Sequence, residues 1–131
     1  MFSAAADSRL TGRESRIRQT VTDYLGSYAN GDIESRVALF APDASFEDPV
    51  GSSPLVGHEA LRNFWLAGAG FTVQMHLELL AINGNEAAYV FTAEIGGDGD
   101  IAQIRTIETI EVDEIGLISR MRAYFDGGSI S

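Results

Sequence analysis

The chain has 131 residues, no cysteine, and nine arginines without a single lysine against nineteen acidic residues, so its formal net charge is −10. This charge argues against nucleic acid and anionic membrane surfaces as partners and favours an uncharged ligand. The lack of cysteine excludes disulfides and thiolate metal sites, and no apolar run approaches the roughly 20 residues of a membrane span.

The first predicted helix runs from a capping box at Thr11-Gly12-Arg13-Glu14 to Asn30-Gly31. Its apolar residues recur at helical spacing and form one buried stripe, made of Ile17, Val21, Tyr24, Leu25 and Tyr28. The start of the chain lacks the basic and hydrophobic regions of a signal peptide, which predicts a cytoplasmic protein. The sequence leaves open whether residues 1–10 are ordered.

Two shorter helices are expected next. Asp32 can cap a helix that stops before Pro42 and whose inward side chains are Ile33, Val37 and Phe40. A third helix is predicted from about residue 58 to residue 67, with Leu61, Phe64 and Trp65 as its apolar side chains.

From residue 71 onward the period changes to two, which is typical of strands. The first strand is expected to place one set of alternating side chains in the core, namely Phe71, Val73, Met75, Leu77 and Leu79. Further strands are predicted over residues 87–95, 101–112 and 117–125. Helices first and antiparallel strands afterwards predict an α+β fold, one domain over residues 1–131 with the helices on one face of a curved sheet.

The stretch Phe46-Glu47-Asp48-Pro49-Val50-Gly51-Ser52 holds a carboxylate on a turn between a short β-like run and the third helix. Because Asp48 precedes a proline, its backbone is excluded from the helical region and the direction of its side chain is fixed. A positioned general base has this setting. An Asp-Pro pair that merely starts a turn has it too.

Side-chain parity within residues 101–112 singles out a second carboxylate. Glu108 shares the more apolar face of this strand with Ile104, Ile110 and Val112, and no arginine lies on that face. If this face is the core, burial raises the pKa of Glu108 and makes it a neutral hydrogen-bond donor. If the strand lies at a sheet edge, Glu108 is solvated, and parity alone leaves both possibilities open.

Three segments of the chain match segments of one known family. They are Tyr24 with Ala29-Asn30-Gly31-Asp32, the loop Glu47-Asp48-Pro49-Val50-Gly51-Ser52, and Met121-Arg122-Ala123-Tyr124-Phe125. They resemble the Δ5-3-ketosteroid isomerases of the NTF2-like superfamily, also called the SnoaL-like fold. The resemblance covers about residues 21–130. It implies a cone-shaped NTF2-like (cystatin-like) fold with three N-terminal helices on a mainly antiparallel sheet, and a homodimer through the open sheet face.

The resemblance also implies roles for three residues. Asp48 corresponds to the general base, which removes a proton next to a ketone and returns it two carbons further along. Tyr24 corresponds to a hydrogen-bond donor to the dienolate oxygen. Glu108 stands where the family has a protonated aspartate as the second donor, so the acid here is one methylene longer. The side chains predicted to line the substrate pocket are Phe40, Trp65, Met121, Ala123 and Phe125.

The resemblance thus implies an isomerase that acts on a 3-oxo steroid or a similar apolar ketone without cofactor or metal. The two histidines, His58 and His76, lie on different elements and lack metal-ligand spacing. In some members of the family, tyrosines stand at the positions of Phe40 and Trp65 and support the first donor, which corresponds to Tyr24. This chain therefore has fewer phenol side chains to support Tyr24. Two alternatives stay open: a SnoaL-like polyketide cyclase or related acid–base enzyme, and a non-catalytic small-molecule-binding module.

Overall fold

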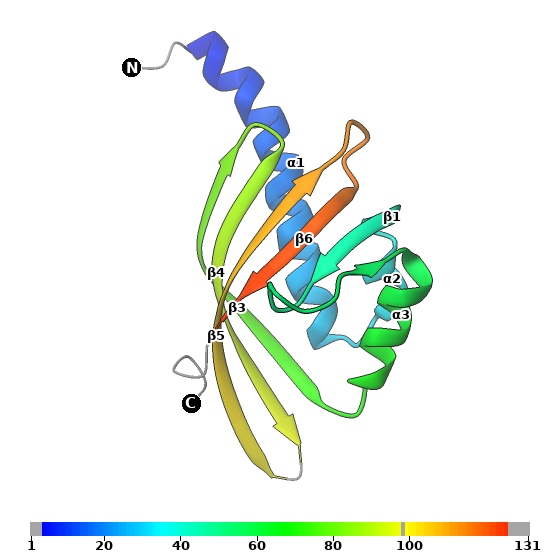
Figure 1. Ribbon diagram of the computed structural model, residues 1–131. Helices are drawn as coiled ribbons and strands as arrows, with labels where there is room; N and C mark the ends of the chain where they lie inside the picture. The colour runs from blue at the N-terminus through cyan, green and yellow to red at the C-terminus, as the bar shows by residue number, and fades with distance from the viewer. Residues whose placement is uncertain (1–3, 98, 126–131) are drawn as a thin grey trace.

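The computed structural model describes residues 4–97 and 99–125, with side chains from residue 12 onward (Figure 1). Along the described chain the elements are α1 (Ala4–Ala29), α2 (Ile33–Val37), β1 (Phe40–Glu47), β2 (Leu55–Val56), α3 (His58–Ala67), β3 (Thr72–Asn83), β4 (Glu86–Gly97), β5 (Asp100–Val112) and β6 (Ile118–Tyr124). Helices thus precede most of the strands, as the sequence predicts.

The strands of the described residues form a single six-stranded sheet in the order β2-β1-β6-β5-β4-β3. Neighbouring strands are antiparallel except β1 and β6, which are parallel. The sheet is strongly curved; α1 packs against β3, and α2 and α3 lie together beside β1 (Figure 1). The predicted α+β class, with helices on a curved and mostly antiparallel sheet, is confirmed.

The first helix ends as predicted but starts earlier. Gly31, with φ +67°, follows its last turn, in the left-handed region that glycine adopts without strain. At the other end the helix reaches back to Ala4, so Thr11 lies inside it and the predicted capping box is wrong. Alanines at positions 4–6 favour helix strongly enough to extend it past Gly12. Residues 1–3 lie outside the described part of the chain.

The second helix is capped as predicted, since Asp32 Oδ1 accepts a hydrogen bond from the Ser35 backbone N–H at 3.1 Å. Phe40, however, does not lie on it: α2 ends at Val37 and Phe40 begins β1. The extended backbone suits the approach to Pro42, because residues before a proline are disfavoured in helical conformation. The helix predicted at residues 58–67 is confirmed as α3, and β2 just before it was not predicted.

β3 departs from strict alternation. Its pairing with β4 shifts between Leu77 and Leu79, which leaves Glu78 as the extra residue of a β-bulge. Before the bulge Val73 and Met75 are half-buried, whereas beyond it the inward side chains are Leu80 and Ile82. The prediction that Phe71, Leu77 and Leu79 lie in the core is therefore wrong, and all three are exposed.

β5 lies between β4 and β6 in the interior of the sheet, so it is not an edge strand. Its buried side chains include Glu108, Ile110 and Val112, whereas Ile107 points outward and is 51% exposed. The predicted parity is confirmed, and the alternative of a solvated Glu108 is excluded. The rest of the core lies between this face of the sheet and the helices and includes Val21, Tyr24, Phe46, Leu61 and Met121.

Candidate active site

The fold brings two distant carboxyl groups into one region. Asp48 follows the last residue of β1, on the loop that leads to β2. This loop is tied to β6 because the Val50 N–H donates to the Ala123 carbonyl oxygen at 2.8 Å. Ala123 is in turn the β6 partner of Glu108 on β5. Backbone hydrogen bonds therefore fix the position of Asp48 relative to Glu108.

Asp48 has the surroundings of an available base. Its side chain is half-buried and makes no hydrogen bond or ion pair to any described residue. Burial raises the pKa of its carboxyl group above the usual value of 3.8. A carboxylate without bound donors keeps its lone pairs free for a proton of a bound molecule, and a raised pKa makes it a stronger base.

Glu108 has the surroundings of a neutral acid. It is 3% exposed, and the Tyr89 hydroxyl donates to its Oε1 at 2.6 Å. Burial raises its pKa from 4.5 to about 8, against the lowering effect of the Tyr89 hydrogen bond, and the negative charge of Asp48 adds to the rise. Its second oxygen binds no other described residue. At neutral pH the carboxyl group of Glu108 is therefore protonated, and its O–H can donate a hydrogen bond.

Tyr24 is fully buried, and its hydroxyl lies 2.7 Å from that of Tyr28, one helical turn further along α1. Burial raises the pKa of both phenols, which stay protonated at neutral pH. The Arg36 guanidinium carbon sits 3.5 Å above the centre of the Tyr28 ring, and its charge lowers the pKa of Tyr28 part of the way back. Tyr28 thus supplies a phenol partner for Tyr24, while Phe40 and Trp65 pack on the Tyr24 ring.

A cavity of about 520 Å³ opens beside this cluster. It lies among the end of α1, α2, α3 and the first half of β3, and its size is typical of a small-molecule site. Its polar lining consists of the side chains of Tyr28, Arg36 and Asp48. Its large apolar side chains are Ile33, Phe64, Trp65, Phe71, Val73, Met75 and Ile95.

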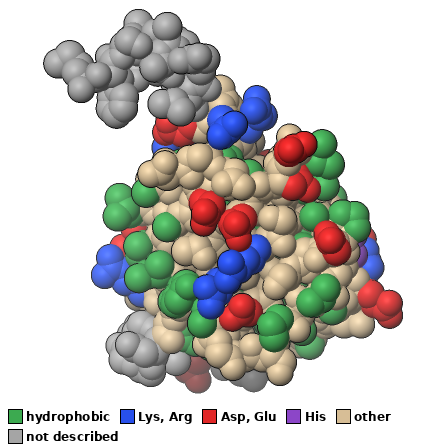
Figure 2. Space-filling view, turned by 45° about the horizontal axis from the view of Figure 1, so that its top comes forward, with side chains coloured by type: hydrophobic (Ala, Val, Ile, Leu, Met, Phe, Trp, Pro, Cys, Tyr) green, Lys and Arg blue, Asp and Glu red, His purple; other side chains and the backbone are tan. Residues whose placement is uncertain are grey.

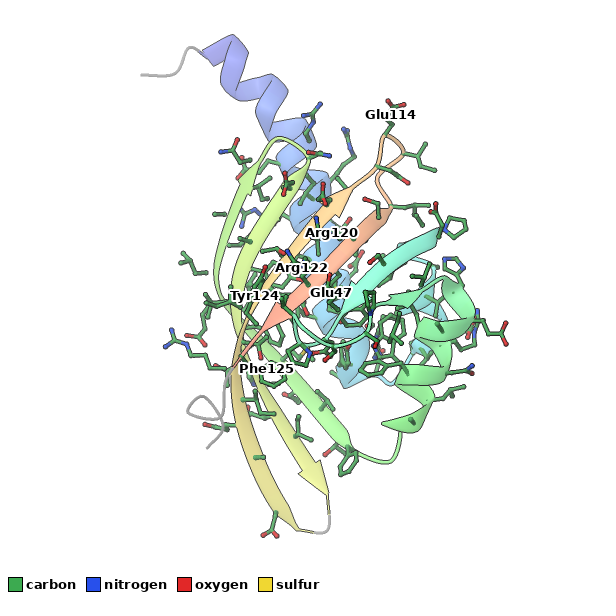
Figure 3. All side chains as sticks on the ribbon, in the orientation of Figure 1. Glu47, Glu114, Arg120, Arg122, Tyr124 and Phe125 are labelled. Carbon is green, nitrogen blue, oxygen red and sulfur yellow. The ribbon has the colours of Figure 1, made fainter. Side chains whose placement is uncertain are left out.

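The predicted site residues divide between this cavity and the core behind it. Asp48 and Trp65 line the cavity, whereas Tyr24 and Glu108 lie deeper, next to Tyr28 and Asp48 respectively. Of the remaining predicted pocket residues, Phe40, Met121 and Ala123 are buried in the core and, like Tyr24 and Glu108, are not part of the cavity lining. Phe125 follows the end of β6 (Figure 3), is 36% exposed and is not among the residues that line the cavity.

Three residues of the site have no predicted role. Tyr28 stands four residues after Tyr24, a spacing that places neighbours on one helix face and that the sequence does display. Arg36 follows Ile33 by three residues, so it shares the inward side of α2. Tyr89 faces Glu108 only through the register of β4 and β5, which no local pattern shows.

A second depression of about 620 Å³ lies between α1 and the turns at the far end of the sheet. Glu114, at the tip of the β5–β6 turn, belongs to its lining (Figure 3). Of its charged side chains, Arg13, Arg16 and Glu114 are exposed and Asp113 is half-buried, and it holds none of the predicted site residues. Within the described ranges, no group of three histidine, aspartate or glutamate side chains is arranged to hold a metal ion, and no helix is long and apolar enough to cross a membrane.

The sequence model of the SnoaL-like domain matches residues 21–121 of the chain. The chain belongs to the SnoaL-like family. Among curated proteins, this SnoaL-like chain is 31% identical over 114 residues to "Steroid Delta-isomerase" of Nocardioides simplex, covering 87% of the chain and 93% of that protein. It is 33% identical over 116 residues to "Epoxide hydrolase LasB" of Streptomyces lasalocidi, covering 80% of the chain but only 39% of that longer protein. The protein is thus a SnoaL-like enzyme.

Two solved structures share its fold. SalBIII, an epoxide hydrolase/cyclase-like enzyme described for pyran ring formation in polyether salinomycin, superposes with a TM-score of 0.83 at 23% identity, covering 90% of the chain and 96% of SalBIII. RV0760c from Mycobacterium tuberculosis gives a TM-score of 0.83 at 24% identity, covering 89% and 96%. These likenesses support the NTF2-like fold that the sequence predicts.

Proposed function

We propose that this SnoaL-like enzyme is a steroid delta-isomerase, which moves the C=C bond of a β,γ-unsaturated 3-oxo steroid or similar ketone into conjugation without a cofactor. Asp48 acts as the general base, and Tyr24 and Glu108 donate hydrogen bonds to the oxygen. The observation that carries this proposal is the pairing of a carboxylate that lacks hydrogen bonds with a buried carboxyl whose pKa is about 8.

The chemistry balances within the substrate. Asp48 takes the proton from the carbon between the carbonyl and the double bond, and the electron pair of the broken C–H bond moves into a dienolate. The same carboxyl group returns the proton to the γ carbon, which leaves the conjugated enone. One oxyanion donor is typically worth about 10² to 10³ in rate, so two neutral donors lower most of the barrier that a weak carboxylate base leaves.

Tyr28 is a positioning residue in this scheme. When its hydroxyl donates to the Tyr24 oxygen, the Tyr24 proton is free to point at the substrate. The stacked Arg36 guanidinium favours this direction, because a nearby positive charge makes the Tyr28 hydroxyl a better donor.

We further propose that the enzyme is a homodimer through the outer face of the sheet. One row of apolar side chains crosses this face from β3 to β6 in register, namely Leu79, Val90, Ile107 and Tyr124. Three of the four are well exposed. Figure 2 shows hydrophobic side chains scattered among acidic and basic ones on the face in view.

A second candidate is epoxide opening with ring closure. It is favoured by the unequal protonation of the two carboxyl groups: Glu108 would protonate the epoxide oxygen as its C–O bond breaks, while Asp48 takes the proton of the attacking hydroxyl. The names of LasB and SalBIII support this reading. The resemblance of the Asp48 loop and the N. simplex relative favour the isomerase.

The test is a spectrophotometric assay with a β,γ-unsaturated 3-oxo steroid, following the conjugated enone. Wild type is expected to turn over, and Asp48→Asn to lose about 10² to 10⁴ in kcat. Asp43→Asn, the same change at an exposed carboxylate of β1, serves as the matched control and should keep full activity.

The isomerase proposal is wrong if wild type does not turn over the steroid, or if Asp48→Asn turns it over equally well. An epoxy alcohol assayed in parallel separates the alternatives. Cyclisation of that compound without steroid turnover would establish the second candidate. Tight steroid binding without either reaction would identify a binding module.

A further inference from the structure

Arg36 places a buried positive charge on the wall of the cavity. It lines the cavity, yet only 4% of its surface is exposed. Its Nε donates to Ser27 Oγ at 2.8 Å and its Nη2 to the Ser27 carbonyl oxygen at 3.1 Å. No carboxylate of the described residues forms an ion pair with it. The carboxylate of Asp32 caps α2 through Ser35 instead.

The guanidinium is held rigidly by what surrounds it. Its carbon lies 3.5 Å from the centre of the Tyr28 ring and 5.0 Å from that of Trp65, and Ser27 occupies the Nε–Nη2 edge. Nη1 has no partner in the described part of the chain. It is also not among the unpartnered polar atoms sealed from solvent there, which are only Trp65 Nε1 and Arg122 Nε. Nη1 therefore reaches the open cavity.

A guanidinium cannot shed its charge, and burying it without an anionic partner costs free energy that an anion would recover. Nη1 is free of described partners, and Nη2 uses one of its two N–H groups on the Ser27 carbonyl oxygen. The Nη1–Nη2 edge of a guanidinium has parallel N–H groups, a geometry that matches the two oxygens of a carboxylate. The net charge of the chain does not indicate a site for an anion, since the chain as a whole is strongly acidic. Among the described residues, the charged side chains on the cavity wall are nevertheless only Arg36 and Asp48.

We infer that the cavity takes a flat apolar ligand that carries a carboxylate, and that Arg36 binds this group. The inference rests on the proposed function, because the ligand occupies the same cavity as the reacting ketone. Arg36 stacks on the face of the Tyr28 ring, whereas the Tyr28 hydroxyl points to Tyr24. The carboxylate end and the reacting oxygen thus bind at neighbouring but separate places. Within the proposed reaction, the preferred substrate is an unsaturated ketone that also carries a carboxylate.

The competing explanation is that Arg36 only clamps Tyr28 in place. A clamp would not distinguish ligands of equal shape and different charge. The experiment therefore uses two matched pairs, 6-hydroxy-2-naphthoic acid with its carboxamide and 4′-hydroxybiphenyl-4-carboxylic acid with its carboxamide. In each, the phenol stands in for the dienolate oxygen, and the two scaffolds differ in length.

Affinities are measured by calorimetry near neutral pH for wild type, Arg36→Met, Arg36→Lys and Arg62→Met. Arg62 is the matched control, because it carries the same charge on the surface, where it pairs with Glu34 at 2.6 Å. Wild type and Arg62→Met are expected to bind at least one acid about tenfold to a hundredfold more tightly than its carboxamide. Arg36→Met should lose this preference.

Equal affinity of wild type for acid and carboxamide in both pairs would overturn the inference, as would a preference that survives in Arg36→Met. If Arg36→Met does not fold, Arg36→Lys decides. Loss of most of the preference supports the inference, since lysine cannot present the planar fork, and an unchanged preference overturns it. A carboxylate preference without isomerisation would refute only the proposed reaction. Isomerisation of a neutral steroid without the preference would refute only the ligand class.

Discussion

Replacing Glu108 by glutamine removes a titrating proton from the core and keeps the shape of the side chain. Tyr89 can still donate to the side-chain oxygen, and the amide still offers N–H donors. The exchange therefore separates two properties of Glu108, its ability to donate a hydrogen bond and its ability to ionise.

The magnitude follows from the pKa of Glu108, which burial raises from 4.5 to about 8. Between these values the folded chain keeps a proton that the unfolded chain releases, so the free energy of unfolding falls as pH rises. The slope is about 1.4 kcal/mol per pH unit. Over the whole window the loss amounts to about 4 to 5 kcal/mol, a large part of the stability of a domain of this size.

The assay is urea unfolding of wild type and Glu108→Gln at several values between about pH 5 and pH 8. Other groups titrate alike in both proteins, so the difference in unfolding free energy isolates Glu108. We expect the variant to gain on wild type by about 1.4 kcal/mol per pH unit across this range. A difference that does not change with pH would refute the reasoning, because it would mean that Glu108 ionises in the folded chain as in the unfolded one.

Two further predictions concern the phenol pair and the sheet face. Tyr28→Phe should lower kcat about threefold to tenfold with little change in KM, because Tyr24 loses one hydrogen bond; steady-state kinetics with the unsaturated ketone checks this, and an unchanged kcat would remove Tyr28 from the scheme. Leu79→Asp and Ile107→Asp should each convert the dimer to a monomer in sedimentation experiments, whereas Ile115→Asp, on the 82% exposed tip of a turn, should not; a monomeric wild type would disprove the dimer.

Local patterns were sufficient for much of the fold. α3 and β4 to β6 were predicted to within a few residues, because their periods are clear and turn residues separate them. The parity of β5 predicted the burial of Glu108. The bulge at Glu78 was not predictable, since the alternation of the sequence continues through it and only the pairing with β4 shifts. The sequence predicts Phe40 on a helix, because its spacing from neighbouring apolar residues is compatible with a helix as well as with a strand.

The site was predicted where a short motif carries it and missed where tertiary packing makes it. Asp48 and Tyr24 stand in recognisable local contexts, and their roles stay predictions until the assays are done. Tyr89 meets Glu108 only through strand register, and Arg36 becomes part of a cavity wall only once α2 packs beside α1 and α3.

Glu78, the extra residue of the β-bulge in β3, matters for protein engineering. Val73 and Met75, ahead of Glu78, line the cavity, whereas Leu79, just after it, faces away from the molecule's interior. The proposed ligand specificity and the proposed dimer contact can therefore be altered independently on one continuous strand. Deleting Glu78 would turn the bulge into a regular ladder, because Leu77 and Leu79 already pair with the consecutive β4 residues Phe91 and Val90, so both faces of the strand would be kept.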